Sequence, residues 1–237
     1  MGIEVKYQSG ETPLYGYLSA PQSDEPAPCV LVVHEWWGCN DYVKRRADML
    51  AEEGYAAMAI DLYGEGKTAT DASEAGTLMN ALLSQESAVL DRFQAALDFL
   101  KGRTEVDQSK IAGIGYCLGG AVVLNMARAG LNLALVASFH GNLSTSNPAQ
   151  SGTVKAQVAV FHGNDDAMIP EEQVNAFKRE MNDAGVDYHF VGYDGAMHGF
   201  TNPLATERGQ KNGLPLAYNE EADTDSWNQL LKLLARL

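Results

Sequence analysis

The sequence predicts an α/β fold: a doubly wound, mostly parallel sheet with helices on both faces and an antiparallel hairpin at its N-terminal edge. Short apolar runs alternate with segments of helical periodicity from about residue 28 onward. These runs lack polar–apolar alternation, which is typical of parallel strands buried on both faces. Before them, Ile3–Gln8 and Leu14–Ser19 do alternate, on either side of Gly10 and Pro13, and therefore predict the hairpin.

Strands and helices are predicted in alternation after the hairpin. The predicted strands are Cys29–His34, Tyr55–Leu62, Lys110–Gly115, Leu133–Phe139, Gln157–His162 and Tyr188–Tyr193. The predicted helices are Asp41–Glu53, Glu86–Lys101, Leu118–Ala129, Pro170–Ala184 and Asp225–Ala235. Gly54 and Gly185 follow two of these helices, and Pro170 with two glutamates after it suits a first helical turn. Residues 70–84 could form another helix, and whether residues 67–85 wall the active site stays open.

Length and composition predict one domain spanning residues 1–237. The chain has 237 residues, of which 46% are hydrophobic and 20% charged, as in an ordinary globular protein. An α/β fold of this size is commonly undivided. The only linker-like stretch, Pro21–Pro28, is interpreted as a surface loop.

Charge and hydropathy exclude several classes of partner. The net charge is −14, whereas binding to phosphates or anionic membranes requires clustered Lys and Arg. No apolar run reaches the roughly 18 residues of a membrane span, and the N-terminus lacks the apolar core of a signal peptide. We therefore expect neither nucleic acid nor membrane as a partner. Monomer and small homo-oligomer both stay open.

The cysteine pattern predicts a reducing environment. Cys29, Cys39 and Cys117 are odd in number and have no C-x-x-C spacing. A disulfide framework or a zinc site is therefore not expected. We predict a cytoplasmic protein that uses no metal and no organic cofactor.

The stretch Gly115–Gly119, with the sequence GYCLG, has the form of a nucleophile elbow in which cysteine replaces serine. It follows the apolar run Ile111–Ile114 and precedes the apolar helical run Ala121–Ala129. Glycines on either side of the nucleophile allow the sharp strand-to-helix turn, and the helix N-terminus favours a thiolate at Cys117. This pattern predicts an acyl-transfer enzyme with an α/β-hydrolase fold and a thiol nucleophile.

An acid and a base follow downstream in the order that this fold uses. Asp166 lies in the loop after strand Gln157–His162, and His198 lies in a glycine-flanked loop after strand Tyr188–Tyr193. We expect His198 to accept the thiol proton and Asp166 to orient its ring. Asp165 competes for the second role, but its position suits a turn residue.

The remaining candidate donors and histidines are assigned from position. The Leu118 N–H, at the start of the helix after the elbow, and the Trp36 N–H, after the strand Cys29–His34, are the predicted oxyanion donors. The other histidines lie in or beside strands and are interpreted as structural; they are His34, His140, His162 and His189.

Five motifs, in order, make the chain resemble the dienelactone hydrolase family over nearly its whole length. They are His34–Gly38 (HEWWG), Asp61–Gly64 (DLYG), Gly113–Gly120 (GIGYCLGG), Gly163–Pro170 (GxxDxxxP) and His198–Phe200 (HGF). The resemblance implies a Cys-Asp-His triad at Cys117, Asp166 and His198. It also implies that Glu35 is an accessory carboxylate that holds the resting thiol protonated until substrate arrives.

The chain departs from this family at the two arginines that hold a substrate carboxylate. Gly64–Gly66 and Thr201–Pro203 stand at those places, and neither Glu nor Asn can replace a bidentate arginine. Whether Lys67 takes over part of that role stays open. A small neutral ester or lactone is therefore the expected substrate. Aromatic side chains are expected to line its pocket, namely Trp37, Tyr63, Tyr116 and Phe200.

Two other functions on the same fold remain as alternatives. One is a non-catalytic ligand-binding protein, because the fold does not determine the function. The other is a redox-sensing protein, in which Cys117 would pair with Cys39 after mild oxidation. A dinucleotide site at Gly113–Gly115 is not expected, because Leu118 occupies the place of the third glycine.

Overall fold

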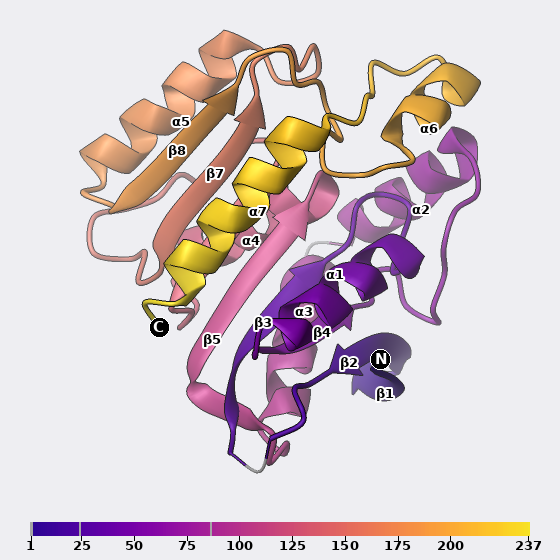
Figure 1. Ribbon diagram of the computed structural model, residues 1–237, viewed down its shortest axis with the longest axis vertical. Helices are drawn as coiled ribbons and strands as arrows, with labels where there is room; N and C mark the ends of the chain where they lie inside the picture. The colour runs from indigo at the N-terminus through magenta and orange to yellow at the C-terminus, as the bar shows by residue number, and fades with distance from the viewer. Residues whose placement is uncertain (1, 24, 86) are drawn as a thin grey trace. The chain divides into compact units, whose positions relative to one another are not determined.

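The computed structural model describes residues 2–23, 25–85 and 87–237. These residues form two compact units, the first ending at Gly113 and the second running from Ile114 to Leu237. The arrangement within each unit is shown in Figure 1. Whether the chain behaves as one domain stays a prediction.

The first unit contains the antiparallel hairpin and the start of the parallel sheet. Its strands are β1 (Ile3–Ser9), β2 (Thr12–Ser19), β3 (Ala27–Val33) and β4 (Ala56–Ile60), in the spatial order β1-β2-β4-β3. Its helices are α1 (Asp41–Glu52), α2 (Ala72–Leu83) and α3 (Ala88–Leu100). β1 pairs with β2 and β2 with β4 in antiparallel register, whereas β3 and β4 are parallel.

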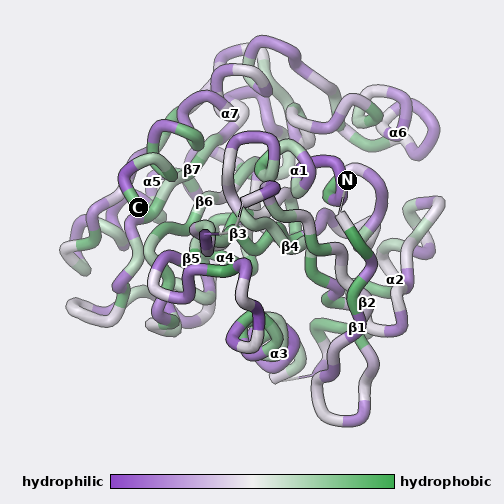
Figure 2. The backbone as a smooth tube through the Cα atoms, turned by 60° about the horizontal axis from the view of Figure 1, so that its bottom comes forward, coloured by the Kyte–Doolittle hydropathy of each residue, from purple (hydrophilic) through white to green (hydrophobic). Residues whose placement is uncertain are grey.

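Burial along these strands follows the hydrophobic pattern. All five residues of β4 are buried, whereas exposed and buried positions alternate through most of β1. Figure 2 shows hydrophobic positions gathered along the central strands β3 and β4. A strand covered on both faces needs apolar side chains throughout, and a strand at the edge needs them on one face only.

The second unit carries the remaining parallel strands. β5 (Val106–Tyr116) starts in the first unit and ends in the second, followed by β6 (Leu135–Phe139), β7 (Gln157–Gly163) and β8 (Tyr188–Tyr193). β6, β7 and β8 pair in parallel in this order. The helices are α4 (Leu118–Arg128), α5 (Glu171–Asp183), α6 (Ala205–Asn212) and α7 (Glu220–Leu234). In Figure 1, α7 crosses in front of these strands and α4 lies behind them.

The predicted α/β fold, with a mostly parallel sheet and an antiparallel N-terminal hairpin, is confirmed. The predicted helix start at Glu86 lies outside the described residues. Pro170 is the N-cap of α5 rather than its first residue, and α7 begins at Glu220 because the Asn219 side chain accepts the Ala222 N–H. The short helix α6 was not predicted, because its polar sequence carries no hydrophobic period and only a left-handed Gly213 marks its end.

Candidate active site

The elbow places Cys117 in a strained backbone conformation between β5 and α4. Cys117 has φ 51° and ψ −112°, a combination that L-residues rarely adopt and that stores about 1–3 kcal/mol. Its N–H donates to the Phe139 carbonyl at 3.0 Å, which ties the turn to β6. A Cβ at Gly115 would lie 2.1 Å from the Gly119 oxygen, so only glycine permits this close approach. The glycine at position 115 is therefore required for steric reasons, as the sequence pattern predicts.

A ladder of aromatic rings supports the elbow from within the second unit. Tyr116 stacks on Phe139 with ring centroids 4.8 Å apart, and Phe139 stacks on Phe161 at the same spacing. Tyr116 is fully buried in this ladder, and Phe200 is fully buried against His140 and Tyr193. Both rings therefore pack in the protein interior, and their contact with substrate stays a prediction.

Two loops at the carboxyl ends of β7 and β8 bring Asp166 and His198 together. The strands are parallel, so both loops leave the sheet at the same edge. The loops also bind each other, because the Asn164 N–H donates to the Tyr193 carbonyl at 2.9 Å and the Asp165 N–H to the Ala196 carbonyl at 3.0 Å.

Cys117, His198 and Asp166 form a chain of two hydrogen-bond contacts, with His198 in the middle. The His198 Nε2 atom lies 3.1 Å from the Cys117 Sγ atom, and Nδ1 lies 2.8 Å from the Asp166 Oδ2 atom. The other Asp166 oxygen accepts the Met168 N–H at 2.8 Å. Asp166 and His198 are buried, whereas Asp165 is exposed and its carboxylate faces the Gly195 N–H. The structure thus places Asp166, not Asp165, against the histidine.

The electrostatics of this cluster favour a charged histidine. Burial lowers the pKa of His198, but the negative Cys117 sulfur and the hydrogen bond to Asp166 outweigh burial and raise the pKa to about 10. The contacts with the sulfur and the carboxylate therefore favour the charged form of the His198 ring. A thiolate is the reactive form of cysteine toward acyl carbon.

His140 is a neighbour of the cluster that the sequence reading treated only as structural. Its ring packs edge-on against His198, with centroids 5.3 Å apart, and its Nε2 atom lies 2.8 Å from the Thr201 Oγ1 atom. His140 also has a positive φ of 42°. The positive φ could not be predicted from the sequence, because histidine adopts it more often than most non-glycine residues but still only rarely.

The predicted residues of the first unit gather around a tight turn after β3. Glu35 and Trp37 are buried, Trp36 is half-buried, and the Gly38 N–H donates to the Glu35 carbonyl at 3.2 Å. Both tryptophans pack in an apolar cluster with Ala69 and two side chains of α2, Ala75 and Leu78. Residues 72–83 therefore form a helix that packs beside Trp36, the predicted oxyanion donor, and Trp37, a predicted pocket residue.

At Gly64–Gly66 and Thr201–Pro203, the two places of the missing arginines, the side chains contact neighbouring protein groups. The Lys67 Nζ atom lies 2.9 Å from the Glu65 Oε2 atom, and both side chains are exposed. At the second place, the Thr201 hydroxyl contacts the His140 ring, and the Asn202 Oδ1 atom accepts the Leu204 N–H at 3.0 Å. Thr201 and Asn202 are also fully buried. The first place thus holds an exposed Lys67–Glu65 pair and the second holds no basic side chain, and whether Lys67 binds a substrate carboxylate stays open.

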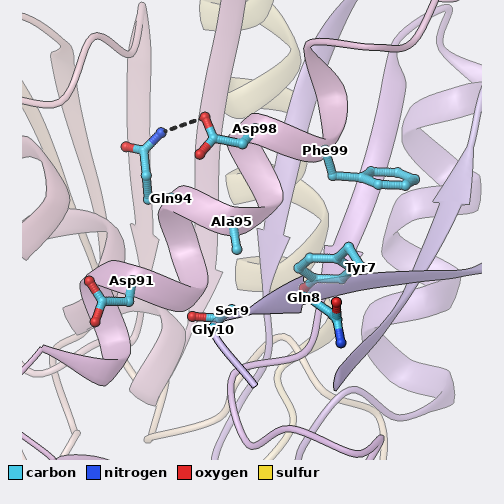
Figure 3. A pocket seen from close by; sticks show the side chains of 9 residues that line it. All are labelled: Tyr7, Gln8, Ser9, Gly10, Asp91, Gln94, Ala95, Asp98 and Phe99. Carbon is cyan, nitrogen blue, oxygen red and sulfur yellow. Dashed lines mark hydrogen bonds between the residues drawn. The ribbon is translucent and has the colours of Figure 1, made fainter. Parts of the chain in front are cut away.

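A separate pocket lies in the first unit between the β1–β2 turn and α3 (Figure 3). Tyr7 and Phe99 form its apolar end, and Asp91 and Asp98 lie on the helix side. No predicted site residue lines it. Among the described residues, no three His, Cys, Asp or Glu side chains are grouped to hold a metal ion, and no helix is long and apolar enough to cross a membrane.

The elbow, the sheet order and the loops that carry Asp166 and His198 define a hydrolase of the α/β-hydrolase class. The profile of the dienelactone hydrolase family matches residues 14–237, and the chain belongs to this family.

Individual relatives match this chain over nearly its full length. Protein usf of Aquifex pyrophilus is 30% identical over 235 residues, which cover 96% of this chain and 95% of that protein. The crystal structure of P91, a dienelactone hydrolase-like promiscuous phosphotriesterase from metagenomic libraries, is 34% identical with a TM-score of 0.91. That match covers 100% of this chain and 98% of P91. The structure named m3DLH is 33% identical, with a TM-score of 0.90 and coverage of 100% and 98%. The predicted α/β-hydrolase fold is thereby confirmed.

Proposed function

We propose that this protein is a thiol-dependent hydrolase of neutral carboxylic esters or lactones that works through a thioester acyl-enzyme. The observation that carries the proposal is the in-line arrangement of Cys117, His198 and Asp166, with contacts of 3.1 and 2.8 Å. A nucleophile, a base and an orienting acid in this geometry meet the requirements of acyl transfer.

In the first half-reaction, the Cys117 thiolate attacks the substrate carbonyl carbon. The new C–S bond moves an electron pair onto the carbonyl oxygen, which the N–H groups of Leu118 and Trp36 would stabilise. Leu118 is the first residue of α4, where backbone N–H groups have no partner within the helix. The tetrahedral intermediate then collapses, and the departing alkoxide takes the proton from His198 Nε2.

In the second half-reaction, water cleaves the thioester. His198 accepts a proton from the attacking water, the C–S bond breaks, and the thiolate is regenerated beside the imidazolium. Asp166 accepts a hydrogen bond from the Nδ1–H group throughout, which keeps Nε2 directed at the reacting atoms. All these steps use only side chains, backbone N–H groups and water, and we propose that no metal or organic cofactor takes part.

Glu35 has the proposed role of an accessory carboxylate. It is only 5% exposed and follows a fully buried strand end, which is an unusual environment for a carboxylate without a function. We propose that its charge disfavours the thiolate in the resting enzyme, as the family resemblance implies.

The preference for a neutral substrate rests on the two former arginine sites. Lys67 is paired with Glu65, and Asn202 is buried and bonded to backbone. A substrate carboxylate would lose its hydration without gaining a bidentate cation. Trp36, Trp37 and Tyr63 would offer apolar and aromatic contacts instead.

Hydrolysis of phosphotriesters is a second candidate activity. The observation that favours it is the 34% identity, over the whole chain, to a promiscuous phosphotriesterase. A phosphotriester is neutral, so its binding does not need the missing arginines, and its phosphoryl oxygen also gains negative charge during attack.

The other features of the proposal concern partners and location. We propose a small-molecule substrate, no nucleic acid or membrane partner, and a cytoplasmic location; the three cysteines are free. Redox sensing through Cys39 is disfavoured, because burial raises the pKa of the Cys39 thiol to about 12 and so removes the thiolate needed for exchange.

A turnover screen tests the proposal directly. Wild type, Cys117→Ala and the matched control Cys29→Ala are assayed with p-nitrophenyl acetate, small lactones, short esters with and without a free carboxylate, and paraoxon, each with and without EDTA. We expect turnover of neutral esters or lactones in wild type and Cys29→Ala only, with no effect of EDTA. Turnover by Cys117→Ala would refute the thiol mechanism, and stoichiometric alkylation of Cys117 without any turnover would favour a binding protein.

A further inference from the structure

The peptide group between Glu35 and Trp36 is held at its oxygen end by two donors. The Glu35 carbonyl accepts the Gly38 N–H at 3.2 Å, which closes the turn, and lies 2.5 Å from the His34 Nδ1 atom. Gly38 has φ 89°, a conformation that favours glycine. Because the peptide is trans, the N–H of Trp36 points away from both donors. Fixing the oxygen therefore fixes the direction of the proposed oxyanion donor.

The two contacts of the His34 ring determine its protonation state. A carbonyl oxygen can only accept, so Nδ1 must carry a proton and donate to Glu35. The Leu62 N–H can only donate, and it lies 3.2 Å from Nε2, so Nε2 must keep its lone pair. The ring is therefore the neutral Nδ1–H tautomer. Complete burial agrees with this state, because it lowers the pKa of His34.

The Asp61–Gly66 loop fixes the next peptide of the same turn. The Tyr63 hydroxyl donates to the Trp36 carbonyl at 2.7 Å, and the Tyr63 ring packs on His34 with centroids 4.8 Å apart. This loop is itself ordered by the buried Asp61 carboxylate, which accepts the N–H groups of Tyr63 at 3.0 Å, Gly64 at 2.8 Å and Gly66 at 2.9 Å. The turn is thus anchored at two successive carbonyls.

We infer that His34 is a positioning residue for ester hydrolysis: its neutral Nδ1–H group locks the Glu35–Trp36 peptide so that the Trp36 N–H is preorganised as an oxyanion donor. The inference rests on the proposed function, in which this N–H stabilises the tetrahedral intermediate. A preorganised donor is effective because no reorganisation is needed when the charge develops. An interior histidine that only filled space would not need a defined tautomer.

The test compares two amides that differ by one methylene group. In His34→Asn, the side-chain N–H₂ can take the place of Nδ1 and still donate to Glu35, whereas in His34→Gln the amide reaches the Nε2 side and contacts Leu62 only. With the best neutral ester, we expect kcat of His34→Gln to fall about 10²-fold with little change in KM, the cost of losing one oxyanion donor. His34→Asn should stay within about fivefold of wild type, because it keeps the donor.

Alkylation of Cys117 by iodoacetamide separates this effect from damage to the triad. Alkylation generates no oxyanion, so its rate should be the same in wild type, His34→Asn and His34→Gln. Equal kcat losses in both variants, an unchanged kcat in His34→Gln, or an alkylation rate that falls together with kcat would each overturn the inference.

The tautomer can be measured without any variant. In protein labelled with ¹⁵N-histidine, we expect one ring, assigned through its contact with the Leu62 amide proton, to remain neutral and protonated at Nδ1 from pH 5.5 to 8.5. An Nε2–H tautomer or an imidazolium at pH 7 would refute the lock even if both variants failed to fold. If wild type and Cys117→Ala hydrolyse esters equally, the proposed function fails, while this measurement still decides the state of His34.

Discussion

Replacing Asp166 by Asn tests the proposed triad, because the site requires two acceptors from this side chain. The Asp166 Oδ1 atom accepts the Met168 N–H, and Oδ2 accepts the His198 Nδ1–H, both at 2.8 Å. An asparagine has one acceptor oxygen and one N–H₂ donor. One of the two contacts must therefore be lost in Asp166→Asn.

The two orientations of the new amide have different consequences. If the N–H₂ group faces His198, the ring must move its proton from Nδ1 to Nε2 and cannot accept one from Cys117. We then expect kcat to fall about 10⁴-fold, which corresponds to about 5 kcal/mol of transition-state stabilisation. If the oxygen faces His198, the Met168 N–H meets another donor in a partly buried site, and unfolding becomes easier by about 1 kcal/mol.

The assay combines steady-state turnover of p-nitrophenyl acetate with urea denaturation, and Asp165→Asn is the matched control. Asp165 is exposed and faces away from His198, so we expect its kcat within about twofold of wild type and its stability within about 0.5 kcal/mol. Asp166→Asn with wild-type turnover and wild-type stability would refute the role of Asp166. A larger loss in Asp165→Asn than in Asp166→Asn would reverse the assignment.

Three further predictions follow from the electrostatics and the glycines. In His198→Gln, iodoacetamide should alkylate Cys117 at least about tenfold more slowly at pH 6, because no imidazolium stabilises the thiolate; an unchanged rate would contradict the ion pair. Burial lowers the pKa of His162 in the folded protein, so as the pH falls this histidine is protonated in the unfolded chain before it is protonated in the folded one. The contribution of His162 to stability is therefore complete above about pH 6.5 and is lost below it. Urea denaturation at pH 7.5 and 5.5 should therefore show a loss smaller by about 1 kcal/mol in His162→Gln than in wild type, and equal losses would exclude the effect. Gly115→Ala should lower the free energy of unfolding by more than about 3 kcal/mol, because its Cβ would lie 2.1 Å from a backbone oxygen. The control Gly76→Ala, with open space around it in α2, should raise the free energy of unfolding by about 0.5–1 kcal/mol. Similar values for the two variants would show that the elbow can relax.

The elements were predictable wherever one signal dominated the local sequence. The apolar runs of β7 and β8 and the periodic helix α4 appear close to their predicted bounds. β7 and α4 bury most of their residues, whereas those of the edge strand β8 are half-buried or exposed. β5 extends beyond its predicted start to Val106, since its first residues include polar side chains that carry no strand signal. The polar helix α6 was missed for a similar reason.

The candidate site was predictable as a set of residues but not as a geometry. Motif order identified Cys117, Asp166 and His198, because the fold requires a nucleophile, an acid and a histidine in that sequence. It did not reveal the edge-on packing of His140 against His198, nor the pairing of Lys67 with Glu65. His140 and His198 lie in different loops, whose approach depends on how the strands align.

The sequence is enough to predict the class of chemistry. A cysteine between glycines at a strand-to-helix turn, with Asp and His downstream, requires only local steric rules and chain order to be recognised. Tertiary structure alone decided which oxygen meets which nitrogen: that the Asp166 carboxylate faces His198, and that the His34 ring donates to the Glu35 carbonyl. Hydrogen bonds have short range and strict direction, so these pairings exist only once β3, β7, β8 and their loops are packed. The elbow therefore predicts a thiol hydrolase, and the packed fold supplies the contacts from which we infer the protonation of His34 and His198.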